Sequence, residues 1–224
     1  MKRIIFLVSG SGGTLKFLLN AFELVKIHYQ IVGVLGDRDC GALKFAENKK
    51  IYCKKIFYNR SNVDELQSEL KHLNPDIIIT NIHKIIDEDT LYLWHDKFIN
   101  VHYSLLPSFG GLIGMETVQK AKEQNVKFIG GTCHKVSKVV DAGKIVQQGC
   151  FSVDWDNDEN VVDTVFKTSC FCLLGGLYNT ENNFFESAKI NNYEVHFSPN
   201  ISFDPSKFDN KFWNLIKNNE DDSI

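Results

Sequence analysis

Three polar side chains of this chain have the types and the spacing that acyl transfer to an amine requires. Asn100 and His102 lie at the end of the apolar run Phe98–His102, and Asp141 follows further along in a Val-Asp-Ala-Gly segment. Because side chains alternate along a strand, Asn100 and His102 would project from the same face. A carboxamide and an imidazole can hold a developing oxyanion, and histidine with aspartate can move an amine proton. These residues therefore predict a site that passes an acyl group to an amine.

These residues need a scaffold that brings the ends of strands together. Short apolar runs alternate along the chain with longer amphipathic segments, a pattern typical of parallel strands joined by helices. Open sheets of this kind bind ligands at the carboxyl ends of their strands, which is where Asn100 and His102 fall. We predict an α/β fold with a Rossmann-like, mostly parallel twisted sheet flanked by helices, and a mixed or antiparallel C-terminal part.

Hydrophobic periodicity and end signals predict the individual elements. Strands are expected at residues 4–8, 31–35, 54–57, 76–80, 98–102, 127–136, 143–153 and, as an edge strand, 193–197. Helices are expected at residues 14–25, 39–49, 62–73, 115–124, 160–178 and 208–216. The segment between residues 105 and 114 carries a proline and three glycines, so it is predicted to be a loop.

A glycine loop, Ser9-Gly10-Ser11-Gly12-Gly13-Thr14, follows the first predicted strand and opens a helix. Glycines let backbone N–H groups approach an anion, and a helix N-terminus favours negative charge. A dinucleotide fingerprint needs a third glycine where Leu15 stands, although Asp37 could serve as its ribose-binding acid. A P-loop needs a lysine that this loop lacks. The loop therefore predicts a phosphate-binding turn, with a tight strand-to-helix turn that binds nothing as the alternative.

Composition limits the class of protein. A chain of 224 residues with 43% hydrophobic residues is long enough for one sizeable α/β domain. The net charge of -3 gives no basic surface for nucleic acid, and the apolar runs are too short to span a bilayer. The six cysteines form no C-x-x-C pair, which predicts free thiols and no metal site. We expect a cytoplasmic enzyme without nucleic-acid or membrane partners.

Asn100, His102, Asp141 and the glycine loop together resemble the signature of the glycinamide ribonucleotide formyltransferase-like family of folate-dependent N-formyltransferases. The resemblance covers most of residues 3–180. It implies that a formyl group moves from 10-formyltetrahydrofolate, the co-substrate, to a primary amine without a metal. Asn100 and His102 would stabilise the tetrahedral oxyanion, while Asp141 would orient the imidazole and accept the amine proton directly or through water.

The resemblance also implies binding roles. The acceptor phosphate would be held by Gly10, Ser11, Gly12, Gly13 and Thr14. The folate would be bound by His83, Lys84, Ile85 and Ile86 and by Val139 and Val140, the residues before Asp141. For His83 and Lys84 the alternative is a solvated helix start. One formyltransferase domain would cover residues 1–224, with an acceptor-binding and phosphate-binding half at 1–100, a catalytic and folate-binding half at 101–180, and a C-terminal extension at 181–224.

The resemblance weakens where the acceptor would bind. Phe166 and Ser169 fall where glycinamide ribonucleotide enzymes carry a glutamine and a glutamate that touch phosphate and ribose. Replacing a ribose-holding carboxylate with a hydroxyl should weaken that acceptor by about 1–3 kcal/mol. Glycinamide ribonucleotide, the acceptor of purine biosynthesis, is therefore the first expectation and not the sole one.

Other functions stay open. One is transfer to a nucleotide-linked amino sugar for surface polysaccharide, in which Tyr103 and Phe109 could stack on the base. Two others are a nucleotide-binding Rossmann-like module of the NAD type, and a relative that binds folate or phosphate without transferring anything. A homodimer is also open, because aromatic residues near the C-terminus could pack between subunits, although their expected place is the core: Phe203, Phe208, Phe212 and Trp213.

Overall fold

The computed structural model describes residues 1–178 and 184–218. The chain forms two compact units: the first contains residues 1–99 and the segment from Phe208 onward, and the second contains residues 100–207. The predicted C-terminal extension is therefore divided between the two. Each unit carries its own strands of a nine-stranded sheet and its own buried residues, so each is described by itself.

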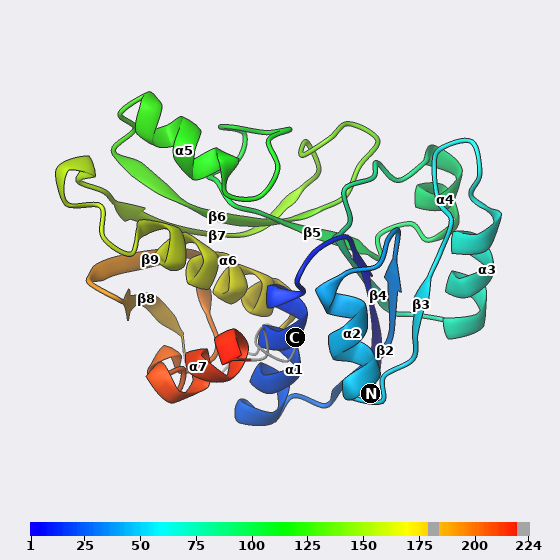
Figure 1. Cartoon of the computed structure of the whole chain (residues 1–224). Helices are drawn as coiled ribbons and strands as arrows, with labels where there is room; N and C mark the ends of the chain where they lie inside the picture. Colours follow the sequence, from blue (N-terminus) through cyan, green and yellow to red (C-terminus); the bar gives the residue numbers. More distant parts are fainter. Residues whose placement is uncertain (179–183, 219–224) are drawn as a thin grey trace. The chain divides into compact units, whose positions relative to one another are not determined.

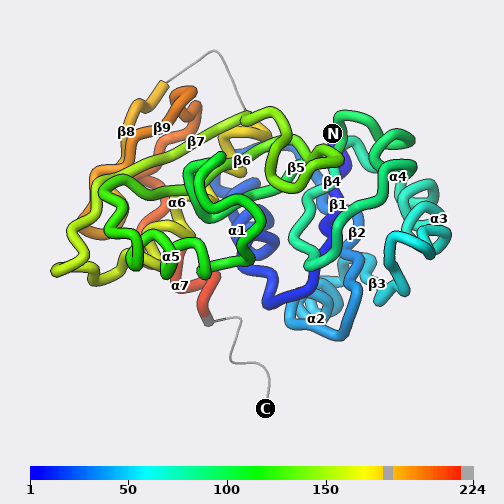
Figure 2. Tube along the Cα trace, turned by 90° about the horizontal axis from the view of Figure 1, so that it is seen from above, coloured from blue at the N-terminus to red at the C-terminus, as the bar shows by residue number. Residues whose placement is uncertain are grey.

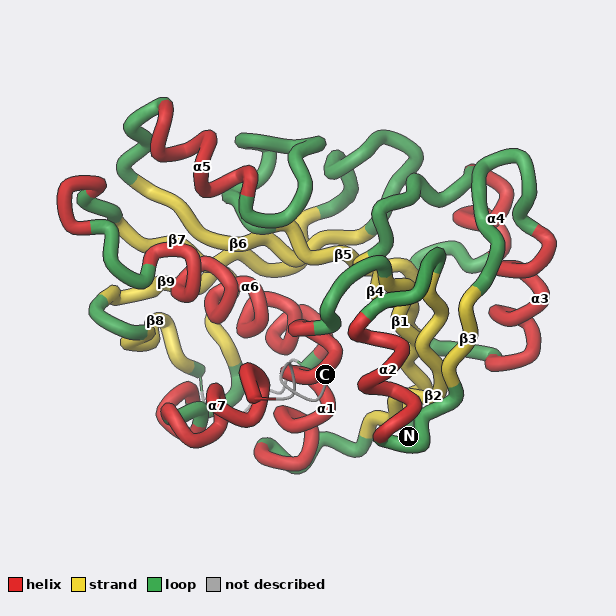
Figure 3. Tube along the Cα trace, viewed as in Figure 1, coloured by secondary structure: helices red, strands yellow, loops and turns green. Residues whose placement is uncertain are grey.

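The first unit is built on a parallel sheet, seen among the yellow strands of Figure 3. Its strands lie in the order β3-β2-β1-β4 and all pair in parallel. The central strand β1 carries the run Ile-Ile-Phe-Leu-Val, whose side chains are all buried, as expected for a strand covered on both faces. The bounds are β1 (Lys2–Val8), β2 (Tyr29–Gly36), β3 (Cys53–Lys55) and β4 (Ile77–Asn81).

Helices follow the strands of the first unit in the alternation that the sequence predicts (Figure 1). Their bounds are α1 (Gly13–Leu24), α2 (Gly41–Asn48), α3 (Asp64–Leu73), α4 (Glu88–Leu93) and α7 (Asn210–Asn218). Helix α7 packs on α1, where Phe17 stacks on Phe208 and Trp213 with ring centroids 5.8 and 5.5 Å apart. The aromatic residues of the C-terminal region are buried, which confirms the expectation that they belong to the core.

The second unit carries antiparallel strands, as predicted. Strand β5 (Phe98–His102) leads into it, and β6 (Phe128–Lys135), β7 (Ile145–Ser152), β9 (Tyr193–Ile201) and β8 (Phe185–Ile190) follow in that spatial order. Figure 2 shows the β8–β9 hairpin beside β7. Its helices are α5 (Glu116–Glu123) and α6 (Val161–Leu177), and α6 packs across β6 and β7. The α/β prediction, with a parallel first part and an antiparallel later part, is confirmed.

The predicted edge strand at 193–197 is wrong. Strand β9 pairs with β7 on one side and with β8 on the other, so β8 takes the outer place. The sequence of β8, Phe-Glu-Ser-Ala-Lys-Ile, mixes polar and apolar residues and gives a weak strand signal. Helix α4 was also not predicted, because its six residues are too few to show helical periodicity.

Candidate active site

His102 ends β5 and is fixed at both ring nitrogens. Its Nδ1 lies 3.3 Å from Oδ2 of Asp141, and its Nε2 lies 2.9 Å from the carbonyl oxygen of Phe109. The side chains of His102 and Asp141 are only 6% and 10% exposed. The carboxylate and the carbonyl oxygen are both acceptors, so each of them faces a ring nitrogen of His102. The two residues that the sequence singled out therefore form one buried pair.

Asn100 lies two residues before His102 on the same strand, and its amide is less constrained. Its Nδ2 is 3.5 Å from Nε2 of His134, a long contact for a hydrogen bond. The Nε2 of His102 is held by the Phe109 carbonyl, so the carboxamide of Asn100 is the more available donor for an oxyanion. The geometry thus gives Asn100 the oxyanion contact and gives His102 and Asp141 the handling of charge and protons.

His134 is a member of this cluster that the sequence reasoning did not identify. It lies on β6 and is 2% exposed, and its Nε2 is 3.6 Å from Oδ1 of Asp141, an ion-pair distance that is too long for a hydrogen bond. Its Nδ1 is 2.9 Å from the Lys135 carbonyl, which orients the ring. The available signal was strand alternation, because His134 falls on the same face of β6 as Thr132. Asp141 therefore lies between two histidines.

The Asp141 carboxylate is held by its surroundings. Its backbone is in the left-handed region at φ 53°, and the N–H of Gly111 donates to Oδ2 at 2.8 Å. Burial alone would raise the pKa of this carboxyl. The interaction with His134, the Gly111 N–H and the charge of His102 outweigh burial, so the pKa of Asp141 lies below its ordinary value. Asp141 is therefore a carboxylate at neutral pH.

Thr132 anchors the loop that follows His102. Its buried Oγ1 accepts hydrogen bonds from the Leu106 N–H at 3.1 Å and from Nε2 of Gln148 at 3.0 Å. It donates to the Ser104 carbonyl at 2.7 Å. Nε2 of Gln148 also lies 3.0 Å from the Leu106 carbonyl. Thr132 on β6 and Gln148 on β7 thus hold the turn that follows β5.

The Thr132→Val substitution should lower the free energy of unfolding by about 2–4 kcal/mol, because it leaves a buried N–H and a buried C=O without the hydroxyl. Urea unfolding of the two proteins measures the difference. The matched control is Thr168→Val on α6, because the Thr168 hydroxyl is buried without a hydrogen-bond partner. That control should be nearly neutral. Equal losses in the two variants would contradict the anchoring role of Thr132.

The glycine loop of the first unit has the features of an anion site. Gly12 is the N-cap of α1 at φ 82°, and no side chain caps this helix. A Cβ at Gly12 would lie 2.8 Å from the Cβ of Ala42, so this position requires glycine. Gly10 and Ser11 are exposed, and Gly13 is half-buried. The hydroxyl of Thr14 is buried and bonded to the amide of Asn81, so Thr14 offers an anion its backbone N–H and not its side chain.

The expected folate-binding segment of the first unit is a loop after β4, not a helix start, because α4 begins at Glu88. His83 and Lys84 are exposed, Ile85 is 45% exposed and Ile86 is buried in the core. The Ser9 hydroxyl accepts from the His83 N–H at 2.7 Å and donates to Asp37 Oδ1 at 2.7 Å. Asp37, considered above as a ribose-binding acid, is thus tied to Ser9.

Tyr58 holds the other end of this segment. Its hydroxyl lies 2.9 Å from the Asp87 N–H, 3.0 Å from Oδ2 of Asp87 and 3.2 Å from the Ile85 carbonyl. The hydroxyl therefore accepts from one backbone group and donates to the neighbouring oxygens. The segment between His83 and Asp87 is held by two buried hydroxyl residues, Ser9 and Tyr58, neither of which the sequence reasoning selected for this role.

The remaining predicted site residues lie in the second unit. Val139 and Val140 are 58% and 47% exposed beside Asp141, so they offer apolar surface to a ligand. Ser169 is fully buried, and a Cβ on Gly131 would lie 2.2 Å from its Oγ. Phe166 stacks on Tyr103 with ring centroids 6.5 Å apart. Ser169 therefore packs α6 against β6. Of Phe166 and Ser169, only Phe166 is partly exposed.

Other classes of site find little support in the described parts of the chain. Within residues 1–178 and 184–218 no group of three His, Cys, Asp or Glu side chains is placed to hold a metal ion. All six cysteines are free, and Cys133, Cys170 and Cys172 are buried, where burial raises the pKa of each thiol. None of the described helices is both long enough and apolar enough to cross a membrane.

Comparison with known proteins agrees with this fold. The formyl transferase family matches residues 2–169. The chain is 32% identical over 155 residues to a phosphoribosylglycinamide formyltransferase of Haemophilus influenzae, covering 66% of this chain and 72% of that protein. It is 27% identical over 158 residues to a formyltetrahydrofolate deformylase of the same organism, covering 68% of this chain and 55% of the relative. The chain thus spans little more than half the length of the deformylase.

Solved structures give the same result. The crystal structure of phosphoribosylglycinamide formyltransferase from Anaplasma phagocytophilum superposes with a TM-score of 0.70 at 27% identity, over 79% of this chain and 85% of that chain. The phosphoribosylglycinamide formyltransferase from Brucella melitensis gives a TM-score of 0.67 at 28% identity, over 79% and 92%. The chain belongs to the formyl transferase family. The expectation that the chain belongs with the formyltransferases is confirmed at the level of the family.

Proposed function

We propose that this protein transfers the formyl group of 10-formyltetrahydrofolate to the primary amine of a phosphate-bearing acceptor, with glycinamide ribonucleotide of purine biosynthesis as the first candidate. The observation that carries the proposal is the buried contact between His102 and Asp141 at the end of the strand that also carries Asn100. The names of the similar formyltransferases support the acceptor.

Asn100 donates its amide N–H to the oxygen that gains negative charge when the amine nitrogen attacks the formyl carbon. His102, paired with Asp141, supplies positive charge beside that oxygen. Asp141 accepts the proton that the amine loses, directly or through water. When the bond between the formyl carbon and the folate nitrogen breaks, that nitrogen takes up a proton. Each oxyanion donor of this kind lowers the barrier by about 3–4 kcal/mol.

The binding roles follow the two units. Gly10, Ser11, Gly12 and Gly13 with the Thr14 N–H bind the acceptor phosphate, because α1 has no side-chain cap to satisfy its first N–H groups. In the first unit, the segment from His83 to Ile86 binds folate through its backbone and the exposed Ile85. In the second unit, Val139 and Val140 offer exposed apolar side chains. Ile86 supports the segment from the core.

The acceptor is tested by incubating the protein with 10-formyltetrahydrofolate and one amine at a time, followed by mass spectrometry of the products. The panel contains glycinamide ribonucleotide and amino sugars linked to uridine or thymidine diphosphate. A product of glycinamide ribonucleotide heavier by one formyl group supports the first candidate. Formylation of an amino sugar alone would replace that acceptor and leave formyl transfer standing. No formylated product with any amine would contradict formyl transfer to amines.

Hydrolysis is the second candidate function, because a relative named formyltetrahydrofolate deformylase matches 68% of this chain. In that reaction water would take the place of the amine at the same Asn100, His102 and Asp141 cluster, and formate would be released. The no-amine sample of the same experiment separates the two functions. Release of formate at the same rate with and without amine supports the deformylase. Deformylated folate that appears only with amine, together with an equal amount of formylated amine and no formate, supports the transferase.

The Tyr58→Phe substitution should raise the KM for the folate co-substrate by about tenfold while kcat changes by less than about twofold. The reason is that the segment from His83 to Asp87 loses its hydroxyl anchor without any change at Asn100 or His102. Steady-state kinetics at varied folate concentration measure KM and kcat separately. Tyr52→Phe is the matched control, because the Tyr52 hydroxyl contacts Glu69 on α3 instead. A fall in kcat at unchanged KM would contradict the folate role of the segment.

A further inference from the structure

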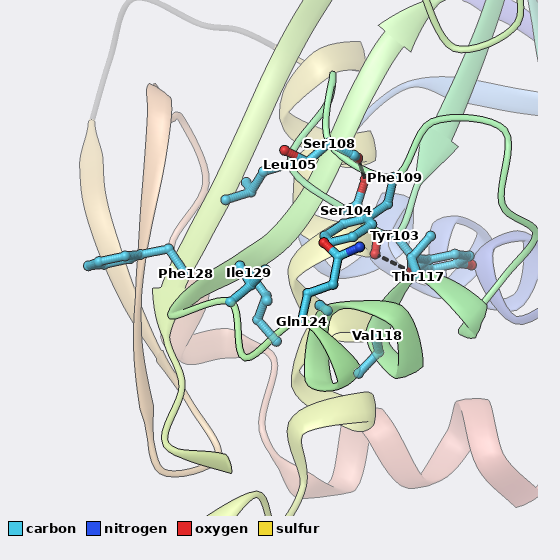
Figure 4. A pocket seen from close by; sticks show the side chains of 12 residues that line it. Tyr103, Ser104, Leu105, Ser108, Phe109, Thr117, Val118, Gln124, Phe128 and Ile129 are labelled. Carbon is cyan, nitrogen blue, oxygen red and sulfur yellow. Dashed lines mark hydrogen bonds between the residues drawn. The ribbon is translucent and has the colours of Figure 1, made fainter.

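A cavity of about 420 Å³ lies in the second unit, beside the loop that follows His102 and outside the cluster around Asp141. Figure 4 shows it between helix α5, the start of strand β6 and the 103–109 segment. Leu105, Val118 and Ile129 contribute apolar walls, and Phe109 contributes an aromatic ring. None of the residues that line it is charged. An apolar cavity with a few polar groups is the usual form of a site for a small neutral ligand.

The polar groups of the cavity are not equally available. The hydroxyl of Thr117 donates to the Tyr103 carbonyl at 2.6 Å, and that of Ser104 donates to the Ser108 carbonyl at 2.5 Å. The carboxamide of Gln124 makes no hydrogen bond with any described residue, and Figure 4 shows it extending from the end of α5 toward the 104–109 loop. A carboxamide offers an acceptor oxygen and, on the same edge, one donor N–H. The carboxamide of Gln124 can therefore form paired hydrogen bonds with a ring whose edge carries an N–H beside a C=O.

Phe109 connects this cavity to the catalytic cluster. Its side chain lines the cavity, and its carbonyl oxygen lies 2.9 Å from Nε2 of His102. Its backbone is at φ 60°, a conformation that is costly for a bulky residue and that persists only where the surroundings enforce it. Two residues further on, the Gly111 N–H holds Asp141. A ligand on the Phe109 ring would thus contact the loop that positions both His102 and Asp141.

We propose that this cavity binds a neutral heteroaromatic ring of the nucleobase type, which packs on the Phe109 ring and pairs its amide-like edge with Gln124. An uncharged lining suits an uncharged ring, because a phosphate or carboxylate buried there would lack a countercharge. Aromatic rings prefer to stack in an offset arrangement or edge to face, and both leave a ring edge free for hydrogen bonds. The bound ring fixes the Phe109 carbonyl and so changes how His102 is held. This inference goes beyond the proposed function, because binding here requires no formyl transfer.

Direct binding tests the cavity. The full chain is titrated with uridine, thymidine, adenosine and guanosine by calorimetry and by saturation-transfer NMR. At least one nucleoside should bind saturably, and Gln124→Ala should weaken it by about fivefold. Gln119→Ala is the matched control, because Gln119 is an exposed glutamine of the same helix outside the cavity. Both are surface substitutions that leave the core intact. Absence of saturable binding at millimolar concentration, or equal weakening by the two variants, would overturn the proposal.

A second measurement tests the connection to His102. With saturating nucleoside, the pH profile of kcat should shift in the wild-type protein and in Gln119→Ala. In Gln124→Ala, a higher nucleoside concentration should be needed to produce the same shift. An unchanged profile with nucleoside bound would overturn the connection. If the nucleoside competes with the formyl acceptor, the ring in the cavity is part of the acceptor. If it does not compete, the nucleoside is a separate effector. Both results support the site. Nucleoside binding by a protein that transfers no formyl group would contradict the proposed function and leave the cavity site standing.

Discussion

Replacing Asn100 with alanine is expected to lower kcat by about a hundredfold or more, with little change in KM. Asn100 offers the most available amide donor in the cluster, because Nε2 of His102 is held by the Phe109 carbonyl at 2.9 Å. An oxyanion contact exists only as charge develops, so its loss raises the barrier without weakening substrate binding. Steady-state kinetics with both substrates varied measures the effect.

The fold should tolerate this change, because the Asn100 side chain is half-buried and its one described side-chain contact, with His134 at 3.5 Å, is long. The matched control is Asn157→Ala, which removes an exposed amide that contacts Asp154. That variant should keep full activity. An Asn100→Ala protein with wild-type kcat and an unchanged unfolding curve would exclude Asn100 from the reaction.

Replacing Asp141 with asparagine is expected to lower turnover by about a hundredfold or more, because the cluster loses the group that orients His102 and accepts a proton. Asparagine keeps the shape of the side chain but cannot take the proton of the amine. It also removes the charge that lies 3.3 Å from His102 and 3.6 Å from His134. The kcat of the purified variant at pH 7, with both substrates saturating, measures the loss.

The same variant has a predicted effect of pH on stability. The pKa of Asp141 in the folded protein is lower than its ordinary value, which is about 3.9 in an unfolded chain. The carboxylate therefore stabilises the fold fully above that unfolded pKa, and the stabilisation is lost as the pH falls through the lower folded pKa. Urea unfolding should show Asp141→Asn to be less stable than wild type at pH 7, with a smaller difference at pH 3.

Asp154→Asn is the control for this pH effect. Asp154 lies in the same unit and contacts Asn157, but solvent screens its charge, so its loss should change stability little at either pH. A gap between wild type and Asp141→Asn that widens on acidification would contradict the assignment of a lowered pKa to Asp141.

The sequence predicted those parts of the fold that depend on strong local patterns. Runs such as Ile-Ile-Ile in β4 and Ile-Ile-Phe-Leu-Val in β1 give buried parallel strands wherever they are followed by helical periodicity. The pairing of His102 with Asp141 was expected from the resemblance to the formyltransferase signature, and the two side chains lie 3.3 Å apart. The inner position of β9 in the sheet was not predictable, because it depends on pairing with β8, whose sequence gives a weak strand signal.

The supporting residues of the site could not be predicted in the same way. His134 stands beside Cys133, and its contact with Asp141 depends on the register of β6. Ser9 and Tyr58 meet the segment after β4 from positions 74 and 27 residues away in sequence, as their contacts with His83 and Ile85 show. Such contacts are set by the packing of several elements and leave no local signal in the chain.

The central claim is that Asn100, His102 and Asp141 carry formyl transfer from a folate to an amine. The most direct test is the rate at which deformylated folate appears, followed by absorbance, with 10-formyltetrahydrofolate and glycinamide ribonucleotide at saturating concentrations. Wild-type protein should release folate only when the amine is present, and Asn100→Ala and Asp141→Asn should each release it about a hundredfold more slowly. Equal rates in wild type and both variants would contradict the claim.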